Sequence, residues 1–328
     1  MRFLIAGLGS IGRRHLRNLV HLGQQDIILF RTGKSTLPEE ELIGFDSETD
    51  LEAALARRPE AVIVSNPTAL HLDVAIPAVQ AGCHILLEKP VSHSLDRLDV
   101  LQRAVARGGG QVLVGFQLRF HPTLQAARQL IGGGRLGRVL SVRAHWGEHL
   151  PDWHPWEDFR VSYAARGDLG GGVLLTLCHP LDYLGWIFGE VEAAEGRMEK
   201  GLGLEVEAAV DATLRFRSGV VATIHLDFLQ RPPQHQLEVV AENGRLRWDG
   251  VSGDLEESAP PDWGWRRTPL PPGFDRNALF VAEMGHFIQV ASGATLPVCS
   301  LEDGIRVQEI IEQIRTSARA AGPRGAAA

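Results

Sequence analysis

The stretch Arg2-Phe3-Leu4-Ile5-Ala6-Gly7-Leu8-Gly9-Ser10-Ile11-Gly12 decides the fold of this chain. It joins an apolar run to the pattern G-x-G-x-x-G, and a helix-like pattern continues over residues 13–22. A strand, a tight turn and a helix in this order predict a dinucleotide-binding unit. Gly7 permits the turn, Gly9 lets the backbone approach a pyrophosphate, and Gly12 lets the helix pack on the strand.

Length and composition indicate a globular protein of more than one domain. The chain has 328 residues, of which 44% are hydrophobic and 22% charged, and this size favours two domains. The composition excludes the disordered and membrane classes. The 33 Lys and Arg residues against 40 Asp and Glu give a net charge of -7, which argues against nucleic acid and membrane partners.

The cysteines and the N-terminal residues favour a cytoplasmic protein. Cys83, Cys178 and Cys299 are widely spaced and form no C-x-x-C pair, so neither a disulfide framework nor a zinc site is predicted. The chain starts directly on its first predicted strand, without the features of a secretory signal. We therefore expect it in the cytoplasm.

The first half of the chain alternates strands and helices. Strands are predicted at residues 26–30, 61–65, 83–87 and 111–115, and helices at residues 50–58, 69–81 and 95–107. Repeated strand–helix units with continuously apolar strands predict a parallel sheet covered on both faces, which is the Rossmann arrangement of the α/β class. We assign residues 1–118 to this domain.

The pattern changes near Arg119, where residues 119–328 are expected to form a substrate and oligomerisation domain. After a helix at 122–131, strands are predicted at 139–146, 206–216, 220–228, 236–241 and 245–248, with hairpin turns at Ser218-Gly219 and Asn243-Gly244. Short connections predict an α+β domain with an open, mostly antiparallel sheet. Further helices are expected at 174–188, 279–291 and 301–318, a surface loop at 255–272 and a frayed end at 322–328, and helix 301–318 could pack back on the first domain.

The end of the second strand favours NADP(H) as the cofactor. An NAD site usually has a carboxylate there for the ribose 2′-hydroxyl, whereas a 2′-phosphate needs cations and donors. The chain offers Arg31, Thr32, Lys34 and Ser35 but no carboxylate. NADP(H) is therefore the expected cofactor and NAD(H) the alternative, unless these charges belong to an ordinary solvated loop.

Two stretches follow other parallel strands at the edge where ligands of open α/β sheets bind. Glu88-Lys89-Pro90 places a lysine that could polarise a carbinol oxygen beside a nicotinamide. By position alone, Lys89 could equally be an exposed lysine in a salt bridge. Ser65-Asn66-Pro67-Thr68 and His71 could line the nicotinamide site, although packing at the start of a helix suits His71 better than proton transfer.

The stretch at residues 168–182 contains three consecutive glycines before a predicted helix. Such glycines allow close approach of a ligand or of another backbone. Thr176, His179 and nearly Asp182 would share one helix face, and His179 could act as a general base or be a hydrogen-bonded core histidine. The ligands are too few for a metal site, and none is predicted.

The segment before these glycines is rich in aromatic and charged residues. Trp153, Tyr163 and Arg166 suit a sugar, whose ring face stacks on aromatic side chains while its hydroxyls form hydrogen bonds. The same composition is typical of a subunit interface. Arg119 could serve the substrate or the cofactor.

Five elements occurring in order along nearly the whole chain resemble the Gfo/Idh/MocA oxidoreductases, the family of glucose-fructose oxidoreductase and inositol dehydrogenase. They are the glycine motif at 7–12, Glu88-Lys89-Pro90, Gly115-Phe116-Gln117-Leu118-Arg119-Phe120-His121-Pro122, the triple glycine leading to His179 and Asp182, and Ser300-Leu301-Glu302-Asp303-Gly304.

The resemblance implies a nicotinamide-dependent dehydrogenase or reductase that acts on a sugar, a sugar nucleotide or a cyclitol at a carbinol carbon. It also implies a homodimer or homotetramer formed through the C-terminal sheet. In the family, the lysine of Glu-Lys-Pro and a histidine of the second domain lie beside the reacting hydroxyl, and these roles pass to Lys89 and His179.

Thr176 departs from the family pattern. Many members carry an aspartate one turn before the histidine, and threonine cannot accept a proton or stabilise an imidazolium by charge. The alternatives are therefore a non-catalytic regulator that binds a dinucleotide and a sugar, or a redox-neutral NAD-dependent glycosidase or lyase.

The candidate site residues form three groups. The catalytic candidates are Lys89, His179 and Thr176. The cofactor-binding candidates are Gly7, Gly9, Ser10, Ile11, Gly12, Arg31, Thr32, Lys34, Ser65, Asn66, Pro67, Thr68, His71, Glu88 and Lys89. The substrate-binding candidates are Arg119, Trp153, Tyr163, Arg166, His179 and Asp182.

Overall fold

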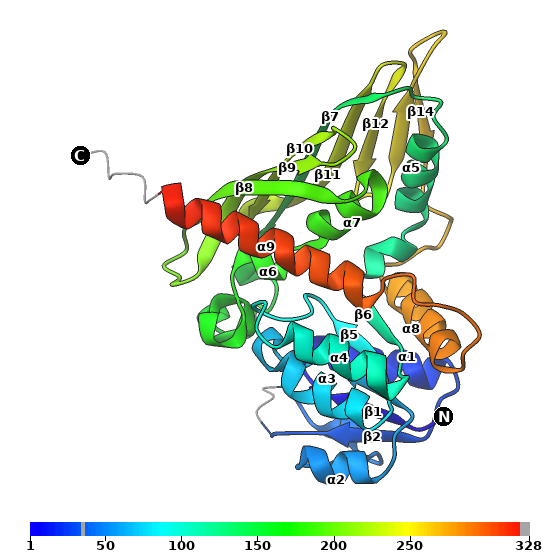
Figure 1. Ribbon diagram of the computed structural model, residues 1–328, viewed down its shortest axis with the longest axis vertical. Helices are drawn as coiled ribbons and strands as arrows, with labels where there is room; N and C mark the ends of the chain where they lie inside the picture. Colours follow the sequence, from blue (N-terminus) through cyan, green and yellow to red (C-terminus); the bar gives the residue numbers. More distant parts are fainter. Residues whose placement is uncertain (34–36, 322–328) are drawn as a thin grey trace. The chain divides into compact units, whose positions relative to one another are not determined.

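The computed structural model describes residues 1–33 and 37–321, and the chain divides into two compact units (Figure 1). Unit 1 comprises Met1–Gln117 and Asp275–Gln308, and unit 2 comprises Leu118–Phe274 and the residues from Glu309 onward. The first segment of unit 1 ends at Gln117, and the sequence analysis assigned residues 1–118 to the first domain. Residues 275–308, which the sequence analysis placed in the second domain, lie in unit 1.

Unit 1 is built on a six-stranded parallel sheet with the strand order β3-β2-β1-β4-β5-β6. Its strands are β1 Phe3–Ala6, β2 Ile27–Phe30, β3 Asp46–Glu48, β4 Ala61–Val64, β5 His84–Glu88 and β6 Val112–Gly115. Every residue of β1 and β4 is buried, as expected for central parallel strands. The predicted Rossmann sheet is confirmed, and its order reverses between β1 and β4, where dinucleotides bind in this fold.

Helices cover both faces of this sheet. They are α1 Ser10–His21, α2 Leu51–Ala56, α3 His71–Gln80, α4 Leu98–Gly108, α8 Asn277–Ala291 and the first part of α9 Leu301–Ala321. Right-handed crossovers place α1 on one face and α3 with α4 on the other. The face that carries α1 would leave β5 and β6 bare, and α8 packs there against α1, β5 and β6.

This packing explains why residues 275–308 belong to unit 1. Phe280, Met284 and Phe287 of α8 are buried, and the Val114 N–H of β6 donates to the Cys299 carbonyl at 3.0 Å. The helical periodicity of residues 279–291 predicted α8 itself, but a sequence pattern does not say which sheet a helix covers.

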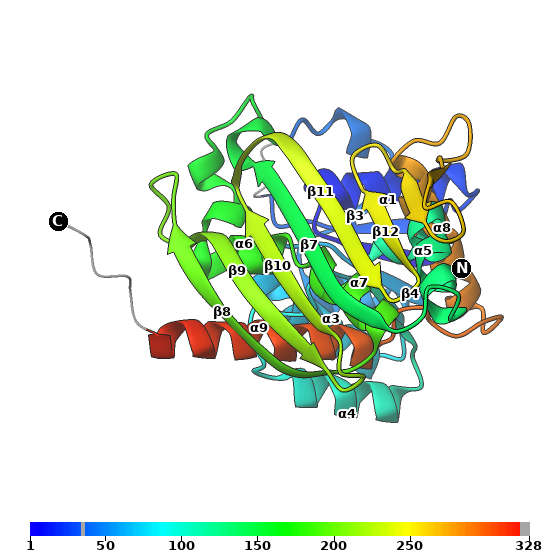
Figure 2. The same ribbon diagram turned by 90° about the horizontal axis from the view of Figure 1, so that it is seen from above.

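Unit 2 contains an eight-stranded sheet with the order β14-β13-β12-β11-β7-β10-β9-β8 (Figure 2). Its strands are β7 Val139–His149, β8 Val191–Lys200, β9 Glu207–Phe216, β10 Val221–Asp227, β11 Leu229–Ala241, β12 Gly244–Asp249, β13 Leu255–Ser258 and β14 Trp265–Thr268. All neighbouring strands are antiparallel except β7 and β10, which run parallel. The predicted mostly antiparallel sheet is confirmed.

One face of this sheet is packed and the other is partly exposed. Helix α5 Pro122–Gly132 contacts β12 and β13, α6 Val173–Thr176 contacts β9 and β10, and α7 His179–Phe188 contacts β7. Along β7 the residues alternate, so that Ala144 and Trp146 are buried while Arg143 is exposed. Side chains such as Arg143 and His145 therefore lie on the face away from the helices.

Two predictions for unit 2 were wrong. Residues 255–272, expected to be a surface loop, contain β13 and β14, which extend the sheet by backbone pairing with β12. The predicted helix 174–188 is divided into α6 and α7, with Leu177 and Cys178 between them. Pro180 has no N–H to donate to the Thr176 carbonyl, so a continuous helix would lose a hydrogen bond there.

Among the described residues, no helix combines the length and apolarity that crossing a membrane requires. The three cysteines are buried thiols outside any disulfide. Burial raises the pKa of Cys83 to about 11. The predicted fraying of residues 322–328 lies outside the described part of the chain.

Candidate functional site

In the glycine turn after β1, neighbouring backbone packs tightly against Gly7 and Gly12, whereas the space beside Gly9 is open. Gly7 has φ +91°, and a Cβ on it would lie 2.4 Å from the Asn66 nitrogen. A Cβ on Gly12 would lie 1.9 Å from the Gly7 carbonyl oxygen and 2.7 Å from Ser65 Oγ. A Cβ on Gly9, in contrast, would meet nothing within 4 Å. The turn thus requires Gly7 and Gly12 for its own packing, and space remains above Gly9.

Helix α1 begins directly at this space. Gly9 is its N-cap and offers no side-chain cap, so the first N–H groups, including those of Ser10 and Ile11, have no side-chain acceptor from the cap. Backbone N–H groups at a helix start favour an anionic ligand. The space above Gly9 and the uncapped helix start together fit a pyrophosphate.

At the end of β2, Arg31 is already paired. Its guanidinium donates to Glu39, and its backbone N–H donates to the Glu48 carbonyl at 2.9 Å. Thr32 follows, whereas Lys34 and Ser35 lie outside the described residues. A carboxylate does stand near this strand end, although it comes from a position further along the chain than the sequence analysis considered.

The stretch after β4 is tied to its neighbours by hydrogen bonds. Ser65 Oγ donates to the Gly7 carbonyl at 2.9 Å, and Asn66 Nδ2 donates to the Leu70 carbonyl at 3.0 Å. The ring nitrogens of His71 lie 2.9 Å from the Pro90 carbonyl oxygen and 3.0 Å from that of Asn66. His71 thus connects this stretch, which includes Pro67 and the buried Thr68, to the Glu88-Lys89-Pro90 turn.

Burial lowers the pKa of His71 to about 4, so its imidazole is neutral near pH 7. A neutral imidazole has a single N–H, so His71 can donate to only one of these two carbonyl groups, and the buried ring packs between them. The position suits the alternative in which His71 shapes the loop rather than transfers a proton.

Glu88 belongs to a buried acidic cluster with His15 and Glu283. His15 Nε2 lies 2.7 Å from Glu88 Oε1, and ligand atoms of the three side chains lie within 4.8 Å of one another. Burial favours the neutral form of Glu88, but the hydrogen bond and charge of His15 and the charge of Lys89 outweigh it and lower the pKa of Glu88. Burial and then the charge of Glu88 raise the pKa of Glu283 well above its usual range.

Glu283 is therefore the protonated member of this cluster, which predicts a pH-dependent stability. Its carboxyl is fully buried, and neither oxygen has a hydrogen-bond partner among the described residues. In the unfolded chain the carboxyl ionises above about pH 4.3, so the folded state loses about 1.4 kcal/mol per pH unit from there up to the raised pKa. Glu283→Gln removes this loss and keeps a donor beside Glu88.

We expect Glu283→Gln to be more stable than the wild type at pH 8, by at least about 1 kcal/mol, and the difference to shrink toward pH 5. Urea unfolding at several pH values measures this. The exposed Glu309→Gln is the control and should change little at any pH. A variant that is equally destabilised at pH 5 and pH 8 would show that Glu283 is ionised in the folded protein.

In unit 2, His179 is the first residue of α7 and packs near the sheet. The centroids of its ring and the Trp146 ring are 5.3 Å apart, and His235 stacks on the Trp146 ring with a centroid distance of 3.8 Å. Trp146 Nε1 donates to Glu148 Oε1 at 2.9 Å. Trp146 and Glu148 share a face of β7, so the strand presents an indole and a carboxylate on the side where α7 lies.

The glycines before α6 serve the packing of the chain on itself. A Cβ on Gly171 would lie 2.4 Å from the Tyr163 carbonyl oxygen, and one on Gly172 would lie 2.4 Å from Glu207 Oε1. Of the two explanations open at the sequence level, the structure shows the close approach of another part of the chain. Thr176 ends α6 and is buried.

Arg119 and Asp182 form a buried ion pair. Arg119 Nη2 donates to Asp182 Oδ1 at 2.7 Å and Nε donates to the same oxygen at 3.1 Å, and both side chains are almost inaccessible. The sequence analysis expected Asp182 to bind the substrate and Arg119 to serve the substrate or the cofactor, and in the structure the pair joins the segment before α5 to α7. Breaking a buried pair by removing one partner leaves an uncompensated charge.

The remaining substrate candidates lie in the segment after β7. The Trp153 ring packs edge-on against Phe228 with centroids 5.7 Å apart. Tyr163 is exposed, and Arg166 donates to Asp168 at 2.5 Å and 3.0 Å. Tyr163 therefore keeps an accessible ring, while the charge of Arg166 is shared with a neighbour.

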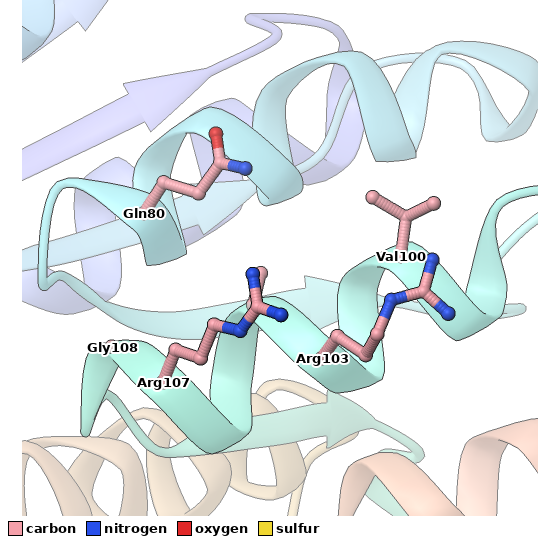
Figure 3. Close-up of a pocket in the computed structure, with 6 residues that line it drawn as sticks. Gln80, Val100, Arg103, Arg107 and Gly108 are labelled. Carbon is pink, nitrogen blue, oxygen red and sulfur yellow. The ribbon is translucent and has the colours of Figure 1, made fainter.

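A hollow of about 230 Å³ lies between α3 and α4, lined by Gln80, Val100, Arg103, Ala104, Arg107 and Gly108 (Figure 3). Gln80 and Gly108 are at the C-terminal ends of their helices, and these ends lead into the N-terminal ends of β5 and β6. Dinucleotides bind at the opposite, carboxyl edge of such a sheet. The hollow is therefore separate from the glycine turn.

The sequence analysis missed His15, Glu283, Trp146, Glu148 and His235. A Trp-x-Glu pair on an alternating strand was a usable signal, because both side chains must share one face. His235 lies one residue before the predicted strand 236–241, and the His15–Glu283 contact joins residues at opposite ends of the sequence, so no local pattern indicated them.

Comparison with known proteins agrees with this architecture. Residues 1–116 match the family described as "Oxidoreductase family, NAD-binding Rossmann fold", and residues 124–247 match the "GFO/IDH/MocA C-terminal domain". A 1,5-anhydro-D-fructose reductase from Ensifer adhaerens is 32% identical over 220 residues, which is 65% of this chain and 61% of the reductase.

Two further relatives are similar to this chain, one in part of its sequence and one in its whole fold. A 2,7-anhydro-N-acetylneuraminate hydratase from Mediterraneibacter gnavus is 31% identical over 158 residues, which cover 47% of this chain and 40% of the hydratase. The structure of a levoglucosan dehydrogenase in complex with NADH and levoglucosan has a TM-score of 0.88 at 20% identity and covers 98% of this chain and 97% of its own.

The match of both parts of the chain to one family agrees with the order of the five sequence elements. This chain has a parallel six-stranded sheet and a second, mostly antiparallel sheet, and it shares this fold with the structural relative. The chain belongs to the Gfo/Idh/MocA family of NAD-binding Rossmann-fold oxidoreductases.

Proposed function

We propose that this protein is an NAD(P)-dependent oxidoreductase that transfers a hydride between nicotinamide and a carbinol or carbonyl carbon of a sugar, a sugar nucleotide or a cyclitol. The observation that carries the proposal is the glycine turn, which is closed around Gly7 and Gly12 but open above Gly9, at the uncapped start of α1. The names of the related reductase and dehydrogenase support the reaction class and the sugar-like substrate.

The residues at the carboxyl edge of the parallel sheet fit a nicotinamide dinucleotide. The N–H groups at the start of α1, including those of Ser10 and Ile11, would hold the pyrophosphate, and the stretch 65–68 with the Glu88-Lys89 turn would line the nicotinamide side. When bound, the nicotinamide supplies the hydride acceptor or donor. His71 and Ser65 keep the two loops in place through the hydrogen bonds described above.

Lys89 and His179 are the proposed catalytic residues. In the oxidising direction, Lys89 orients and polarises the substrate hydroxyl, and His179 accepts its proton; in reduction the same pair returns the proton. Trp146 packs beside the His179 ring and limits its orientation. Thr176, which replaces the aspartate of many relatives, could position the hydroxyl or the imidazole, and His179 would work without a carboxylate at that position.

The substrate would contact the aromatic segment before α6. Tyr163 offers an exposed ring, and Trp153 and Arg166 lie in the same segment. Stacking on aromatic rings and hydrogen bonds to hydroxyls are the contacts that a sugar requires. Arg119 and Asp182, which are buried against each other, would support this region rather than touch the substrate.

NADP(H) is the proposed preferred cofactor, and it makes Arg31 a testable specificity residue. Arg31 follows β2 directly and is held by Glu39, whose carboxylate a 2′-phosphate would replace as the partner of the guanidinium. A charge-assisted hydrogen bond contributes about 1.5–3 kcal/mol, so Arg31→Ala should lower kcat/KM for NADP(H) by about 10–100-fold. The value for NAD(H) should change by less than about 3-fold, because its ribose carries no phosphate there.

Steady-state kinetics with both cofactors measures this effect, and Arg103→Ala in α4 is the matched control. If the wild type prefers NAD(H), or if the Arg31 variant loses activity equally with both cofactors, the proposed preference is wrong.

Turnover tests the proposed function directly. Purified protein is mixed with each nicotinamide cofactor and a panel of aldoses, anhydro sugars, cyclitols and nucleotide-linked sugars, and the nicotinamide absorbance is followed in both directions. We expect turnover with at least one polyhydroxylated substrate. Tight cofactor and sugar binding with neither an absorbance change nor any product would indicate the regulator instead.

The hydratase among the relatives supports a second candidate function, a redox-neutral reaction. Such an enzyme would retain its cofactor and convert its substrate without net reduction. Chromatographic analysis of the same reaction mixtures separates the two, because only the redox-neutral enzyme forms product without a change in nicotinamide absorbance.

We also propose that the protein works in the cytoplasm as a homodimer or homotetramer. The partly exposed face of the eight-stranded sheet would form the subunit contact, as the family resemblance implies. Light scattering on the purified protein measures the number of subunits.

A further inference from the structure

A second cluster of titratable side chains lies on the partly exposed face of the eight-stranded sheet, apart from the residues proposed for hydride transfer. The parallel pairing of β7 and β10 places His145 opposite His225 and Gly147 opposite Asp227. His225 and Asp227 are two residues apart on one strand, so their side chains share a face. Trp146, the neighbour of His145, points to the opposite face, where His179 lies.

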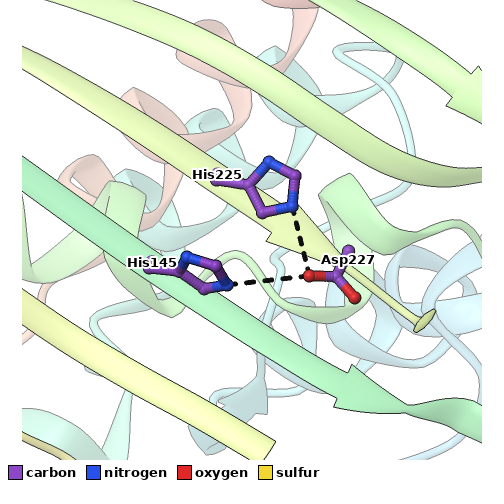
Figure 4. A group of neighbouring side chains, drawn as sticks. All are labelled: His145, His225 and Asp227. Atoms are coloured by element: carbon purple, nitrogen blue, oxygen red, sulfur yellow. Dashed lines mark hydrogen bonds and ion pairs between the residues drawn. The ribbon is translucent and has the colours of Figure 1, made fainter. Parts of the chain in front are cut away.

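The three polar side chains converge (Figure 4). Asp227 Oδ2 lies 3.1 Å from His225 Nε2 and 3.7 Å from His145 Nε2, and the three atoms lie within 4.8 Å of one another. In a tetrahedral zinc site with bonds of about 2.0–2.1 Å, neighbouring ligand atoms are about 3.3 Å apart. The observed separations require only small side-chain movements to reach that geometry.

A second layer of contacts orients the ligands. His225 Nδ1 lies 2.7 Å from Asp211 Oδ1 of β9 and Nε2 lies 3.1 Å from Asp227 Oδ2, so both ring nitrogens can donate to carboxylates. When a metal ion displaces the Nε2 proton, Asp211 keeps the proton on Nδ1 and Nε2 becomes the lone-pair donor. Carboxylate–histidine contacts of this kind are typical of metal-binding histidines. The Leu229 N–H donates to Asp227 Oδ1 at 2.7 Å, so the other carboxylate oxygen, Oδ2, faces the histidines.

The backbone beside Asp227 is shaped for its carboxylate. A Cβ at Gly147 would lie 2.6 Å from Asp227 Oδ2 and 2.5 Å from Gln230 Oε1. The glycine therefore makes room for both oxygens, and Gln230 Oε1 lies 2.7 Å from His145 Nε2. The amide oxygen accepts from His145 Nε2 in the absence of metal, and once the ion displaces that proton the same oxygen could complete the ligand set.

The cluster is accessible and carries negative charge. The His145 and His225 side chains are 31% and 36% exposed, while Asp227 is buried. In a single subunit an ion can therefore reach the imidazoles while the carboxylate is shielded from competing water, and in the proposed oligomer the same site would lie within the subunit contact. Asp227 and Asp211 together supply the negative charge that a divalent cation requires.

We propose that His145, His225 and Asp227 form a binding site for a divalent transition-metal ion of the zinc class, with Asp211 as the residue that orients His225. Two imidazoles and one carboxylate suit zinc and its neighbours, whereas magnesium and calcium prefer sites made of oxygen ligands. The ion would connect β7 to β10 on the face opposite His179, so it would stabilise the sheet rather than take part in hydride transfer.

A proton competes with the ion. The hydrogen bonds and charges of Asp227 and Asp211 together raise the pKa of His225 to about 9, against the opposing effect of burial. Zinc binding therefore displaces a proton from the imidazole, and affinity is best measured at pH 8.

Equilibrium dialysis of the full chain against ZnCl₂, after removal of metal with a chelator, tests the site. The wild type should bind one saturable zinc ion per chain, and zinc should raise its Tm. His145→Asn and His225→Asn should abolish saturable binding, and Asp211→Asn should weaken it by about 10–100-fold. Circular dichroism checks that each variant is folded, and His21→Asn in α1 is the control, which should bind as the wild type does.

Co²⁺ provides an independent readout if a histidine variant fails to fold. Visible absorption of tetrahedral Co²⁺ should appear with the wild type and be reduced with the milder Asp211→Asn variant. The proposal is overturned if the wild type binds no zinc saturably, or if binding is unchanged in the folded His145 and His225 variants. Neither result bears on the proposed hydride transfer, which is measured with the chelator-treated protein.

Discussion

Lys89→Ala and His179→Ala should each lower kcat/KM for the proposed reaction by about 10²–10⁴-fold, the range that a positioned proton-transfer or polarising group contributes. Lys89 follows Glu88 at the carboxyl edge of the parallel sheet, and His179 begins α7 beside Trp146. Without the ammonium, the oxygen of the reacting carbinol loses its polarising charge. Without the imidazole, the proton of that hydroxyl has no acceptor.

The two effects should not add. Residues that act on one oxygen are coupled, so the double variant should lose little more than the worse single variant. Cofactor affinity, measured by fluorescence titration, should stay within about 10-fold for His179→Ala, since the proposed dinucleotide site lies on the other unit. Lys200→Ala, which removes an exposed lysine paired with Glu205, is the matched control.

The assignment fails if either variant retains the wild-type kcat/KM while binding cofactor normally. Loss in only one of the two would show that the family roles do not transfer to both residues. Thr176→Asp tests the departure from the family pattern in the same assay, because it restores the carboxylate that many relatives carry one turn before the histidine.

Gly12→Ala should destabilise unit 1 strongly. An added Cβ would lie 1.9 Å from the Gly7 carbonyl oxygen and 2.7 Å from Ser65 Oγ, and the first of these is backbone that cannot rotate away. Overpacking of this kind costs about 3 kcal/mol, which corresponds to a fall in Tm of roughly 6–12 °C for a unit of this size. Thermal unfolding followed by circular dichroism measures the change.

Gly9→Ala separates ligand approach from folding. A Cβ there would meet nothing within 4 Å, so its Tm without cofactor should stay close to that of the wild type. Its cofactor affinity should nevertheless fall by at least about 10-fold, because the methyl group would occupy the space proposed for the pyrophosphate. Gly132→Ala in α5, which also meets nothing within 4 Å, is the control for both readouts.

If the Gly9→Ala variant binds cofactor as tightly as the wild type, the pyrophosphate does not bind at the glycine turn. A Gly12→Ala variant with unchanged Tm would mean that α1 can move away from β1 at little cost, in contrast to the contacts that the structure shows.

Several parts of the fold could be predicted because the signal is local. The apolar strands of unit 1 and their connecting helices follow from patterns within about 10 residues, and parallel pairing follows from the crossover helices. Strands β3, β8, β13 and β14 were missed because they carry little apolar alternation; β3, β8 and β14 are edge strands, and β13 is held between β12 and β14 by backbone pairing. The division of the 174–188 helix was missed although Pro180 was a local signal for it.

The sequence predicts the motifs of the candidate site but not the contacts that its residues make. The glycine turn, Glu88-Lys89-Pro90 and His179 are recognisable from neighbouring residues. The sequence does not show whether Arg119 and Asp182 are buried or exposed, and their role as substrate-binding residues stays a prediction. Their bidentate pairing across 63 positions became visible only in the folded chain.

The sequence by itself determined which segments become strands and helices and which glycines must stay unsubstituted, because backbone sterics and apolar periodicity act over a few residues. Tertiary structure alone decided that α8 returns to cover β5 and β6, that Glu283 is buried beside Glu88, and that β7 pairs with β10 so that His145 meets His225. These contacts join residues far apart along the chain, and they exist only once burial of the sheet faces has paid the entropy of closing the long loops between them.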